Sequence, residues 1–390
     1  MTIEGSKAAS GGRRIRLGMV GGGEGAFIGS VHRMAARLDD HYEFVAGALA
    51  STPEKARRSG EALGLDPARI YADFAAMAAG EAKREDGVEA VSIVTPNHMH
   101  APVARAFLEA GIHVICDKPL TTTLVEAKAL REAVARAGRI FALTHNYTGY
   151  PMVRQAREMV RAGELGRLRL VQAEYAQDWL AERLEATGQK QAEWRTDPER
   201  SGPGGCIGDI GTHAHNLADF ITGLSLSEVA ADVTTFVEGR RVDDNVQIML
   251  RYAGGAKGAL WASQVAPGHE NDLSIRIYGE KGGLSWRQTD PNYLTFARLG
   301  HPPQTIGRNG PGAGAAAARV SRIPPGHPEG YLEGFATIYS EVAQAILAAR
   351  DGRSALEEVL FPTIEDGVKG VAFIEAALAS AKKGGAWVGL

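Results

Sequence analysis

Three polar side chains in two short segments have the residue types that proton transfer at a substrate oxygen requires. Asp209 and His213 are spaced four residues apart, just before an apolar helical pattern. On a helix both side chains would point to one face, where the carboxylate can orient the imidazole or raise its basicity. Lys118 follows Asp117 at the end of an apolar run, and its ammonium group can hydrogen-bond a substrate hydroxyl and stabilise a developing alkoxide. A surface lysine before a helix is the alternative for Lys118.

The aspartate and histidine pair has two further interpretations. Asp209 and His213 could form a structural pair, or they could bind a metal together with His215. A metal site needs three or four converging ligands, and only the tertiary structure could add His98 and His100 to this group. We therefore expect proton transfer and no metal site.

A glycine-rich segment has the pattern of a dinucleotide-binding turn. The run Gly21-Gly22-Gly23-Glu24-Gly25-Ala26 matches G-x-G-x-x-G/A and lies directly between an apolar run and a helical pattern. Glycines permit a tight turn and let backbone N–H groups and a helix N-terminus approach a pyrophosphate. Gly29 is a candidate for the glycine that packs helix against strand, which would make this loop longer than usual. A purely structural glycine turn is the alternative.

The end of the second predicted strand decides which dinucleotide is expected. That strand lacks the terminal acidic residue that bonds the ribose hydroxyls of NAD, and Ser51 and Thr52 follow it instead. Lys55 and Arg58, one turn further, could contact a 2′-phosphate or could be ordinary surface charges. We therefore expect either NAD or NADP as the cofactor.

Five short apolar runs alternate with helical patterns in the first half of the chain. They lie at 15–20, 44–49, 90–95, 113–116 and 140–144. This alternation predicts βαβ crossovers, and hence a parallel, doubly wound sheet with helices on both faces. Ligands of such sheets bind beyond the carboxyl ends of the strands, where the glycine turn and Asp117 would lie. The second helix is predicted to begin at Thr52 and Pro53, a capping residue followed by a first-turn proline.

The rhythm changes after about residue 146. A helix at 151–161 precedes strand-like segments at 168–175, 228–236, 245–252, 257–264 and 273–278, and helices are predicted again at 331–349 and 367–383. Short connections suit antiparallel pairing, so we predict an α+β domain with an open, largely antiparallel sheet. The segment 301–330 is rich in Pro, Gly and Ala and is expected to be a long loop, either mobile or a lid, on which His327 could approach the site.

Length and composition are those of a globular protein with two domains. The 390 residues are 44% hydrophobic and 23% charged, and the net charge of −3 provides no field to attract nucleic acid or an anionic membrane. Cys116 and Cys206 are too few for a disulfide framework and, with no long apolar run, indicate the cytoplasm. We expect a disordered tail at 1–14, a dinucleotide-binding domain at 15–146, and a substrate-binding and oligomerisation domain at 147–390.

Taken in order, these segments resemble the glucose-fructose oxidoreductase and inositol dehydrogenase family (Gfo/Idh/MocA) from about Arg14 to Leu390. The resemblance is carried by Thr95-Pro96-Asn97-His98-Met99-His100, by Asp117-Lys118-Pro119, which looks like the family's E-K-P motif with Asp for Glu, and by the Gly205 to His213 run, which looks like its G-x-x-x-D-x-G-x-H segment. It implies a Rossmann domain, an α/β domain whose open sheet commonly forms dimers or tetramers, and Lys118, Asp209 and His213 as catalytic residues. Asn216 stands where many members have Asp. The extended glycine loop is more similar to the sugar and glycoside dehydrogenase branches than to the biliverdin reductase branch.

The resemblance implies an NAD(P)-dependent oxidoreductase that moves hydride between nicotinamide and a ring carbon of a sugar, glycoside or cyclic polyol. A glycosidase or lyase that oxidises C3 transiently and a non-catalytic cofactor-binding sensor are the alternatives. The expected cofactor contacts are Gly21, Gly23, Gly25, Ala26, Phe27, Ile28, Ser51, Thr52, Lys55, Thr95, Pro96, Asn97, His100, Asp117 and Lys118. The expected substrate contacts are His213, Tyr147, Asp178, Trp179, Trp194 and Arg195, because aromatic faces can cover a sugar ring while charged groups meet its hydroxyls. Core packing is the alternative for the two tryptophans.

Overall fold

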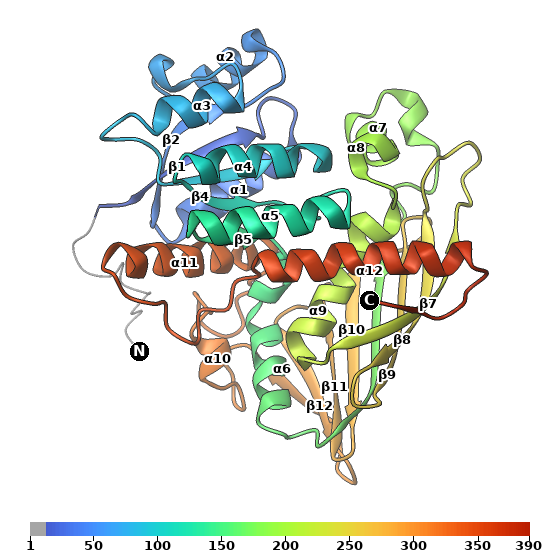
Figure 1. Ribbon diagram of the computed structural model, residues 1–390. Coiled ribbons are helices and arrows are strands. Elements are labelled where there is room, and N and C mark those ends of the chain that lie inside the picture. The colour runs from blue at the N-terminus through green and yellow to red at the C-terminus, as the bar shows by residue number, and fades with distance from the viewer. Residues whose placement is uncertain (1–12) are drawn as a thin grey trace. The chain divides into compact units, whose positions relative to one another are not determined.

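The five apolar runs of the first half form a parallel sheet, which confirms the predicted doubly wound α/β fold. The computed structural model describes residues 13–390 and gives the strand order β2-β1-β3-β4-β5. The strands are β1 (Ile15–Gly21), β2 (Tyr42–Ala48), β3 (Ala90–Val94), β4 (His113–Cys116) and β5 (Phe141–Leu143). They alternate with the helices α1 (Phe27–Leu38), α2 (Pro53–Ala62), α3 (Phe74–Glu81), α4 (His100–Glu109) and α5 (Leu124–Ala137), as Figure 1 shows in blue and teal.

Local sequence signals set the start of α2 as predicted. The Thr52 hydroxyl accepts a hydrogen bond from the Lys55 N–H at 3.4 Å, and Pro53 occupies the first helical position, where its missing N–H costs nothing. Residues 1–12 of the expected tail lie outside the described residues. Arg13 and Arg14, which end that tail, form ion pairs with Glu89 and Asp40.

Helix α11 (Tyr331–Arg350) belongs by its contacts to the same unit as the parallel sheet. Contacts within the described chain separate one unit at 13–121, 125–149 and 331–368 from a second at 122–124, 150–330 and 369–390. In the first unit, Phe335 and Tyr339 of α11 join the buried cluster of α1 and the sheet, and the Tyr339 hydroxyl contacts His32 Nδ1 at 2.8 Å. The domain ranges 15–146 and 147–390 stay a prediction, and these contacts group 331–368 with the first sheet.

Nine strands of the second unit form an open sheet, which confirms the predicted largely antiparallel arrangement. Its order is β13-β12-β11-β10-β6-β9-β8-β7-β14, and β6 and β9 are its one parallel pair within the described chain. The strands are β6 (Leu168–Ala176), β7 (Leu226–Thr234), β8 (Asn245–Tyr252), β9 (Lys257–Ser263), β10 (Asp272–Gly279), β11 (Gly282–Arg287), β12 (Tyr293–Arg298), β13 (Gln304–Gly307) and β14 (Val388–Gly389). Strands β11 to β13 were not expected from the sequence.

Helices pack on one face of this sheet. After β5 the chain forms α6 (Pro151–Arg161), α7 (Lys190–Arg195), α8 (Pro198–Ser201), α9 (Thr212–Thr222), α10 (Ala315–Ala318) and α12 (Ile364–Lys382), as well as α11 of the first unit. Two of these helices, α6 and α9, contact the strands of the sheet. Helix α9 contacts β6, β9 and β10, and α6 contacts β11 and β12 (Figure 1). The sheet therefore has one face covered by helices within its own unit, and side chains such as Met249 on the opposite face stay exposed.

The segment 301–330 is mostly loop, as predicted, but it also has two short regular elements and is held by a buried arginine. Its role as a mobile segment or a lid that carries His327 stays a prediction. The segment contains β13 and α10, and Arg308, 3% exposed, donates to the carbonyl oxygens of Ile323 at 2.6 Å and Pro324 at 3.1 Å. Arg308 also forms a buried ion pair with Glu329 at 2.8 Å. These contacts join residues far apart in sequence, which is why periodicity did not reveal them.

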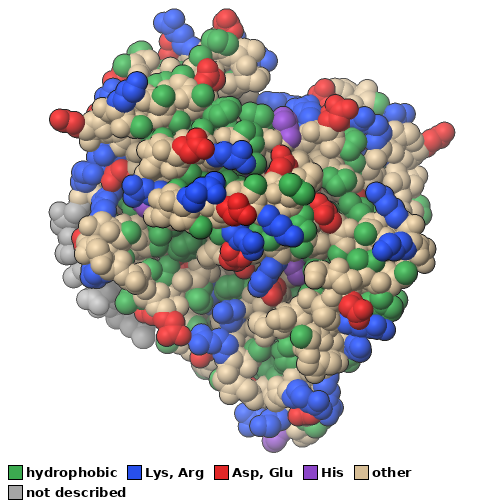
Figure 2. All heavy atoms as spheres, in the orientation of Figure 1, with side chains coloured by type: hydrophobic (Ala, Val, Ile, Leu, Met, Phe, Trp, Pro, Cys, Tyr) green, Lys and Arg blue, Asp and Glu red, His purple; other side chains and the backbone are tan. Residues whose placement is uncertain are grey.

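The surface carries charges of both signs. In the view of Figure 2, Lys and Arg side chains lie among Asp and Glu side chains, in keeping with the small net charge of −3. Among the described residues, no helix combines the length and the apolar character that crossing a membrane requires.

Candidate active site

The glycine turn after β1 has a backbone that other residues would strain. Gly21, Gly22 and Gly25 have φ values of 80°, 73° and 75°, in the left-handed region that favours glycine. A Cβ on Gly29 would lie 2.3 Å from Gly22 Cα, so only a glycine lets α1 approach the turn this closely. The prediction that Gly29 is the close-packing glycine of a lengthened loop is confirmed.

This turn fits the pyrophosphate of a dinucleotide. No side chain caps the N-terminus of α1 at Ala26, and the first turn carries no acidic residue, so the positive end of the helix dipole meets no opposing charge there. Gly23 donates to the Leu49 carbonyl at 3.0 Å, and a Cβ on Gly23 would lie 2.5 Å from that oxygen. The Thr95 hydroxyl is buried and has no hydrogen-bond partner within the described part of the chain, as expected of a group that awaits a ligand.

The two residues that open α1 have different surroundings. Phe27 is 61% exposed, which leaves its ring accessible to a ligand held by the turn. Ile28 packs against two buried clusters of the first unit, so its side chain stabilises the core.

An ion pair lies beside the glycine turn, between the loop and α2. Glu24 receives the Arg58 guanidinium at 3.2 Å, and the Glu24 N–H donates to the Ser59 hydroxyl at 3.0 Å. Ser51, Thr52 and Lys55 are exposed at the start of α2. The sequence analysis considered Arg58 only as a contact to a 2′-phosphate or as a surface charge, so its pairing with Glu24 was not predicted.

The side chains of His100 and Asp117 link the segments that follow β3, β4 and β5. His100 is fully buried, and its ring nitrogens contact the carbonyl oxygens of Thr95 at 2.9 Å and Pro119 at 2.7 Å. Asp117 Oδ1 accepts from the Lys118 N–H and from the Thr144 hydroxyl, both at 2.9 Å. His100 and Asp117 therefore fix the backbone that carries the Thr95-Pro96-Asn97 and Lys118 segments, and their direct contact with a cofactor stays a prediction.

In the second unit, the segment before α9 is a π-helical turn. This turn, η5 (Ile207–Gly211), carries Asp209, and His213 follows on the first turn of α9. The Thr212 N–H donates to the Ile207 carbonyl, five residues back, which is the hydrogen bond that defines a π turn. Single π turns inside helices are frequent at functional sites.

The Asp209 carboxylate is anchored by two neighbours. Its Oδ2 accepts from Gln264 Nε2 at 2.9 Å, and the Arg195 guanidinium lies 3.4 Å away. The His213 ring packs 6.1 Å from the ring of Tyr175 on β6. A fixed carboxylate and an imidazole four residues apart on one helical segment have the composition of a proton-transfer site.

A polar network continues from this carboxylate along the ends of the strands. Gln264 lies 3.4 Å from Gln177 Oε1, which also accepts from the Trp179 indole at 2.9 Å. Asn271 Oδ1 accepts from Gln177 Nε2 at 2.6 Å and from the Tyr175 hydroxyl at 2.8 Å. Sequence reasoning missed Gln264, Gln177, Asn271 and Tyr175. Gln177 and Gln264 directly follow β6 and β9, and only the parallel pairing of these two strands brings the glutamines together.

The predicted substrate contacts divide into two groups. Trp179, Trp194 and Arg195 are half-buried and join the Asp209 network, with the Arg195 guanidinium stacked 4.2 Å from the Trp194 ring. Asp178 accepts from the Gly268 N–H at 3.1 Å, and Tyr147 is 3% exposed in the first unit. Both tryptophans are partly exposed, which argues against the alternative that they only pack in the core.

His215 and the two cysteines of the motifs are buried in the protein interior. No group of three or more His, Cys, Asp and Glu side chains that could hold a metal occurs among residues 13–390. His215 stacks on Phe373 with ring centroids 4.4 Å apart, and burial lowers its pKa to about 4. Cys116 and Cys206 are buried free thiols whose pKa values burial raises.

Comparison with known proteins identifies both halves of the chain. Residues 15–145 match the oxidoreductase family with an NAD-binding Rossmann fold, and residues 153–285 match the GFO/IDH/MocA C-terminal domain. The uncharacterized oxidoreductase YfiI of Bacillus subtilis is 34% identical over 396 residues, which cover 100% of this chain and 99% of YfiI.

Two solved structures share this architecture over nearly the whole chain. An oxidoreductase from Sinorhizobium meliloti is 57% identical, with a TM-score of 0.88 over 97% of this chain and 100% of its own. An inositol dehydrogenase homologue from Azotobacter vinelandii, solved with NADH and myo-inositol, is 37% identical, with a TM-score of 0.90 over 97% of this chain and 98% of its own. The chain therefore belongs to the Gfo/Idh/MocA family of oxidoreductases and carries that family's NAD-binding Rossmann fold.

Proposed function

We propose that this chain is a cytoplasmic NAD(P)-dependent dehydrogenase that acts on a ring carbon of a sugar, glycoside or cyclic polyol. The observation that carries the proposal is the Asp209 carboxylate, held by the Gln264 amide and the Arg195 guanidinium four residues before His213, in a network that extends through Gln177 to the Trp179 indole. Such groups match the hydroxyls and the apolar face of a ring substrate. The myo-inositol held by the Azotobacter vinelandii homologue is a ligand of the same chemical class.

Each proposed catalytic residue has a distinct role. A bound nicotinamide supplies the hydride acceptor or donor. The Lys118 ammonium hydrogen-bonds the reacting oxygen and stabilises negative charge that develops on it, and an imidazole nitrogen of His213 takes up or returns the hydroxyl proton. Asp209 holds the imidazole in the orientation and protonation state that this exchange needs, while Gln264 and Arg195 fix the carboxylate itself.

The network residues are proposed to bind the other hydroxyls of the substrate. Gln177, Asn271 and Gln264 present amide groups that both donate and accept hydrogen bonds, which suits hydroxyls of a polyol. Trp179 and Trp194 provide partly exposed aromatic faces for the C–H side of the ring.

A panel of sugars, glycosides and cyclitols tests this proposal. Reduction of NAD and NADP is followed at 340 nm for wild type and for His213→Gln, and we expect stoichiometric NADH or NADPH from at least one ring polyol and none from the variant. Product formation without net reduced cofactor would indicate the glycosidase or lyase instead. A folded protein that binds NADH tightly and turns over no member of the panel would contradict the dehydrogenase.

We propose that NAD and NADP both bind, with their ratio set beside the glycine turn. No carboxylate follows β2 directly, while Ser51 and Thr52 offer hydroxyls to a 2′-phosphate. Glu24 forms an ion pair with Arg58 of α2 and adds a charge that opposes phosphate. This pair supports tolerance of NADP and no strong preference for it.

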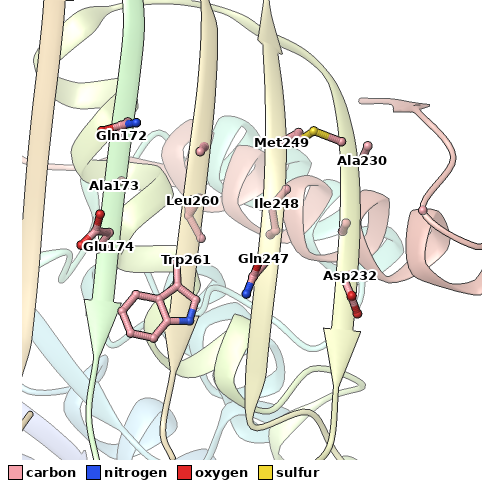
Figure 3. A pocket seen from close by; sticks show the side chains of 13 residues that line it. Gln172, Ala173, Glu174, Ala230, Asp232, Gln247, Ile248, Met249, Leu260 and Trp261 are labelled. Carbon is pink, nitrogen blue, oxygen red and sulfur yellow. The ribbon is translucent and has the colours of Figure 1, made fainter. Parts of the chain in front are cut away.

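We also propose that the open face of the nine-stranded sheet pairs with another copy of the chain, as a dimer or a tetramer. Figure 3 shows a shallow pocket on this face, where Glu174, Gln247 and Trp261 project from neighbouring strands. Met249, at 56% exposure, adds an apolar side chain to the same surface. Light scattering after gel filtration tests the pairing: we expect a multiple of 41.4 kDa for wild type and a smaller species for Met249→Arg. The control Val125→Arg, on the exposed side of α5, should keep the wild-type mass, and a monomeric wild type would contradict the pairing.

A further inference from the structure

A buried aspartate from a distant loop caps the turn that carries the proposed catalytic pair. Asp243 is 5% exposed and precedes β8, 34 residues after Asp209 in the chain. Its Oδ1 accepts from the Gly205 N–H at 2.7 Å, its Oδ2 accepts from the Ile207 N–H at 2.8 Å, and its carbonyl oxygen accepts from the Cys206 N–H at 2.9 Å. One residue therefore binds three consecutive backbone N–H groups.

These are three of the four N–H groups that a helix start leaves without partners inside the helix. The helical segment opens at Cys206, and the Gly205 carbonyl accepts the Asp209 N–H at 2.9 Å, which makes Gly205 the cap position. Cys206 has no oxygen in its side chain and caps nothing. The acceptors come instead from Asp243. Two of them are carboxylate oxygens, so the hydrogen bonds from Gly205 and Ile207 are stronger than bonds between neutral groups.

The close fit of the two segments requires glycine at the cap. A Cβ on Gly205 would lie 2.2 Å from the Asp243 carbonyl oxygen and 2.6 Å from Val242 Cγ2. The sequence therefore pairs a glycine in the turn with an acidic residue in the loop before β8. Burial raises the pKa of Asp243 to about 6, the two backbone hydrogen bonds oppose that rise, and Asp244 adds to it.

We propose that Asp243 is a positioning residue for the reaction: it fixes the π turn and the start of α9, and thereby where Asp209 and His213 present their polar atoms. The inference rests on the proposed function, because it assigns Asp243 to the same proton-transfer site. Asp209 lies two residues beyond the last N–H that Asp243 binds, with no other side-chain oxygen shown at this helix start among the described residues. A loosened cap would leave the turn free to move by the few tenths of an ångström that proton transfer does not tolerate.

The chain offers a matched control in the next residue. Asp244 is fully buried, and its two carboxylate oxygens accept from the Phe236 and Val237 N–H groups at 2.9 and 3.0 Å. Like Asp243, it is a buried carboxylate that binds two backbone N–H groups, but it holds a different loop and also forms an ion pair with Arg240 at 3.3 Å. Asp243→Asn and Asp244→Asn each replace one accepting oxygen by an NH₂ group that faces an N–H donor, and both variants should lose thermal stability.

Only the Asp243 variant should lose turnover selectively. We expect Asp243→Asn to lower kcat by at least about tenfold, with the KM for substrate and the Kd for NADH within about threefold of wild type. Hydrogen exchange read by mass spectrometry should accelerate in the peptide that covers 204–213. Asp244→Asn should keep kcat within about threefold while exchange accelerates at 236–237 instead.

Two outcomes would overturn the positioning role. One is a wild-type kcat for Asp243→Asn, and the other is an equal loss of kcat in Asp244→Asn, which would reveal a general effect of stability. Should the Asn variant fail to fold, Asp243→Ser, whose hydroxyl accepts one of the two N–H groups, carries the same expectations with a smaller loss of kcat. The variant His213→Gln separates this test from the proposed function. If His213→Gln loses turnover and the Asp243 variants do not, the positioning role of Asp243 is refuted and the proposed function stands. If His213→Gln keeps full turnover, the proposed proton-transfer site itself is refuted.

Discussion

Replacing Gly29 by alanine should damage cofactor binding without touching the cofactor directly. The new Cβ would lie 2.3 Å from Gly22 Cα, 2.5 Å from Gly22 O and 2.8 Å from Gly22 C. All three are backbone atoms, so no side chain can rotate away. Either the start of α1 or the glycine turn must shift by about 1 Å to restore ordinary contact distances.

The size of the effect follows from what that shift moves. Overpacking costs about 1 to 3 kcal/mol of stability, and the gain in helix propensity from Gly to Ala returns up to about 1 kcal/mol. A displacement of 1 Å also exceeds what a hydrogen bond to a pyrophosphate oxygen tolerates, and one such charge-assisted bond contributes about 1.5 to 3 kcal/mol. We therefore expect the Kd for NADH to rise by about 10- to 100-fold, while the protein stays folded.

Titration of NADH by fluorescence or calorimetry measures this Kd, and circular dichroism reports the fold. Gly330→Ala is the matched control, because a Cβ there meets no atom within 4 Å. Its Kd should equal that of wild type. A folded Gly29→Ala protein with a Kd within about twofold of wild type would show that the close approach of α1 to the turn does not shape the cofactor site.

Three further predictions concern turnover, cofactor choice and pH. Lys118→Met should lower kcat by at least about 100-fold and leave the Kd for NADH within a few fold, since the glycine turn holds the cofactor; near-normal turnover would remove Lys118 from the mechanism. Glu24→Gln should free Arg58 and tighten binding of NADP at least about threefold relative to NAD in binding titrations. Ala50→Asp should instead favour NAD by about tenfold. If neither variant changes the ratio of the two Kd values, the 2′-phosphate binds elsewhere. The unfolded chain protonates His215 near pH 6.5 and the folded chain only near about 4, so its contribution is complete above pH 6.5 and is lost as the pH falls. Urea unfolding of His215→Gln should thus lose about 2 kcal/mol less than wild type between pH 7 and 5, and equal losses would refute the neutral buried imidazole.

The parts of the site that short segments encode could be predicted from the sequence. The glycine turn, its partner Gly29 and the Thr52 cap depend on residues within about eight positions of one another, and the structure has each of them. Asp209 and His213 were found by their spacing, but the π-helical form of the turn at Ile207–Gly211 and the group that caps it, Asp243, were not predicted.

The environment of the candidate residues depended on contacts that no local pattern records. Gln264 reaches Asp209 because β9 pairs in parallel with β6, an exception in an otherwise antiparallel sheet. Arg308 likewise orders a segment whose composition is typical of a loop, because its hydrogen-bond partners lie about 15 residues away.

The sequence alone determined the fold class, the dinucleotide-binding turn and the identity of the proposed catalytic side chains, because strand and helix periods and glycine conformations are properties of neighbouring residues. Tertiary structure alone decided that α11 packs on α1, that Glu24 pairs with Arg58 and that Asp243 caps the turn before Asp209. Each of these contacts joins side chains or backbone groups at least 34 positions apart, so it exists only once strand order and register have brought the segments together.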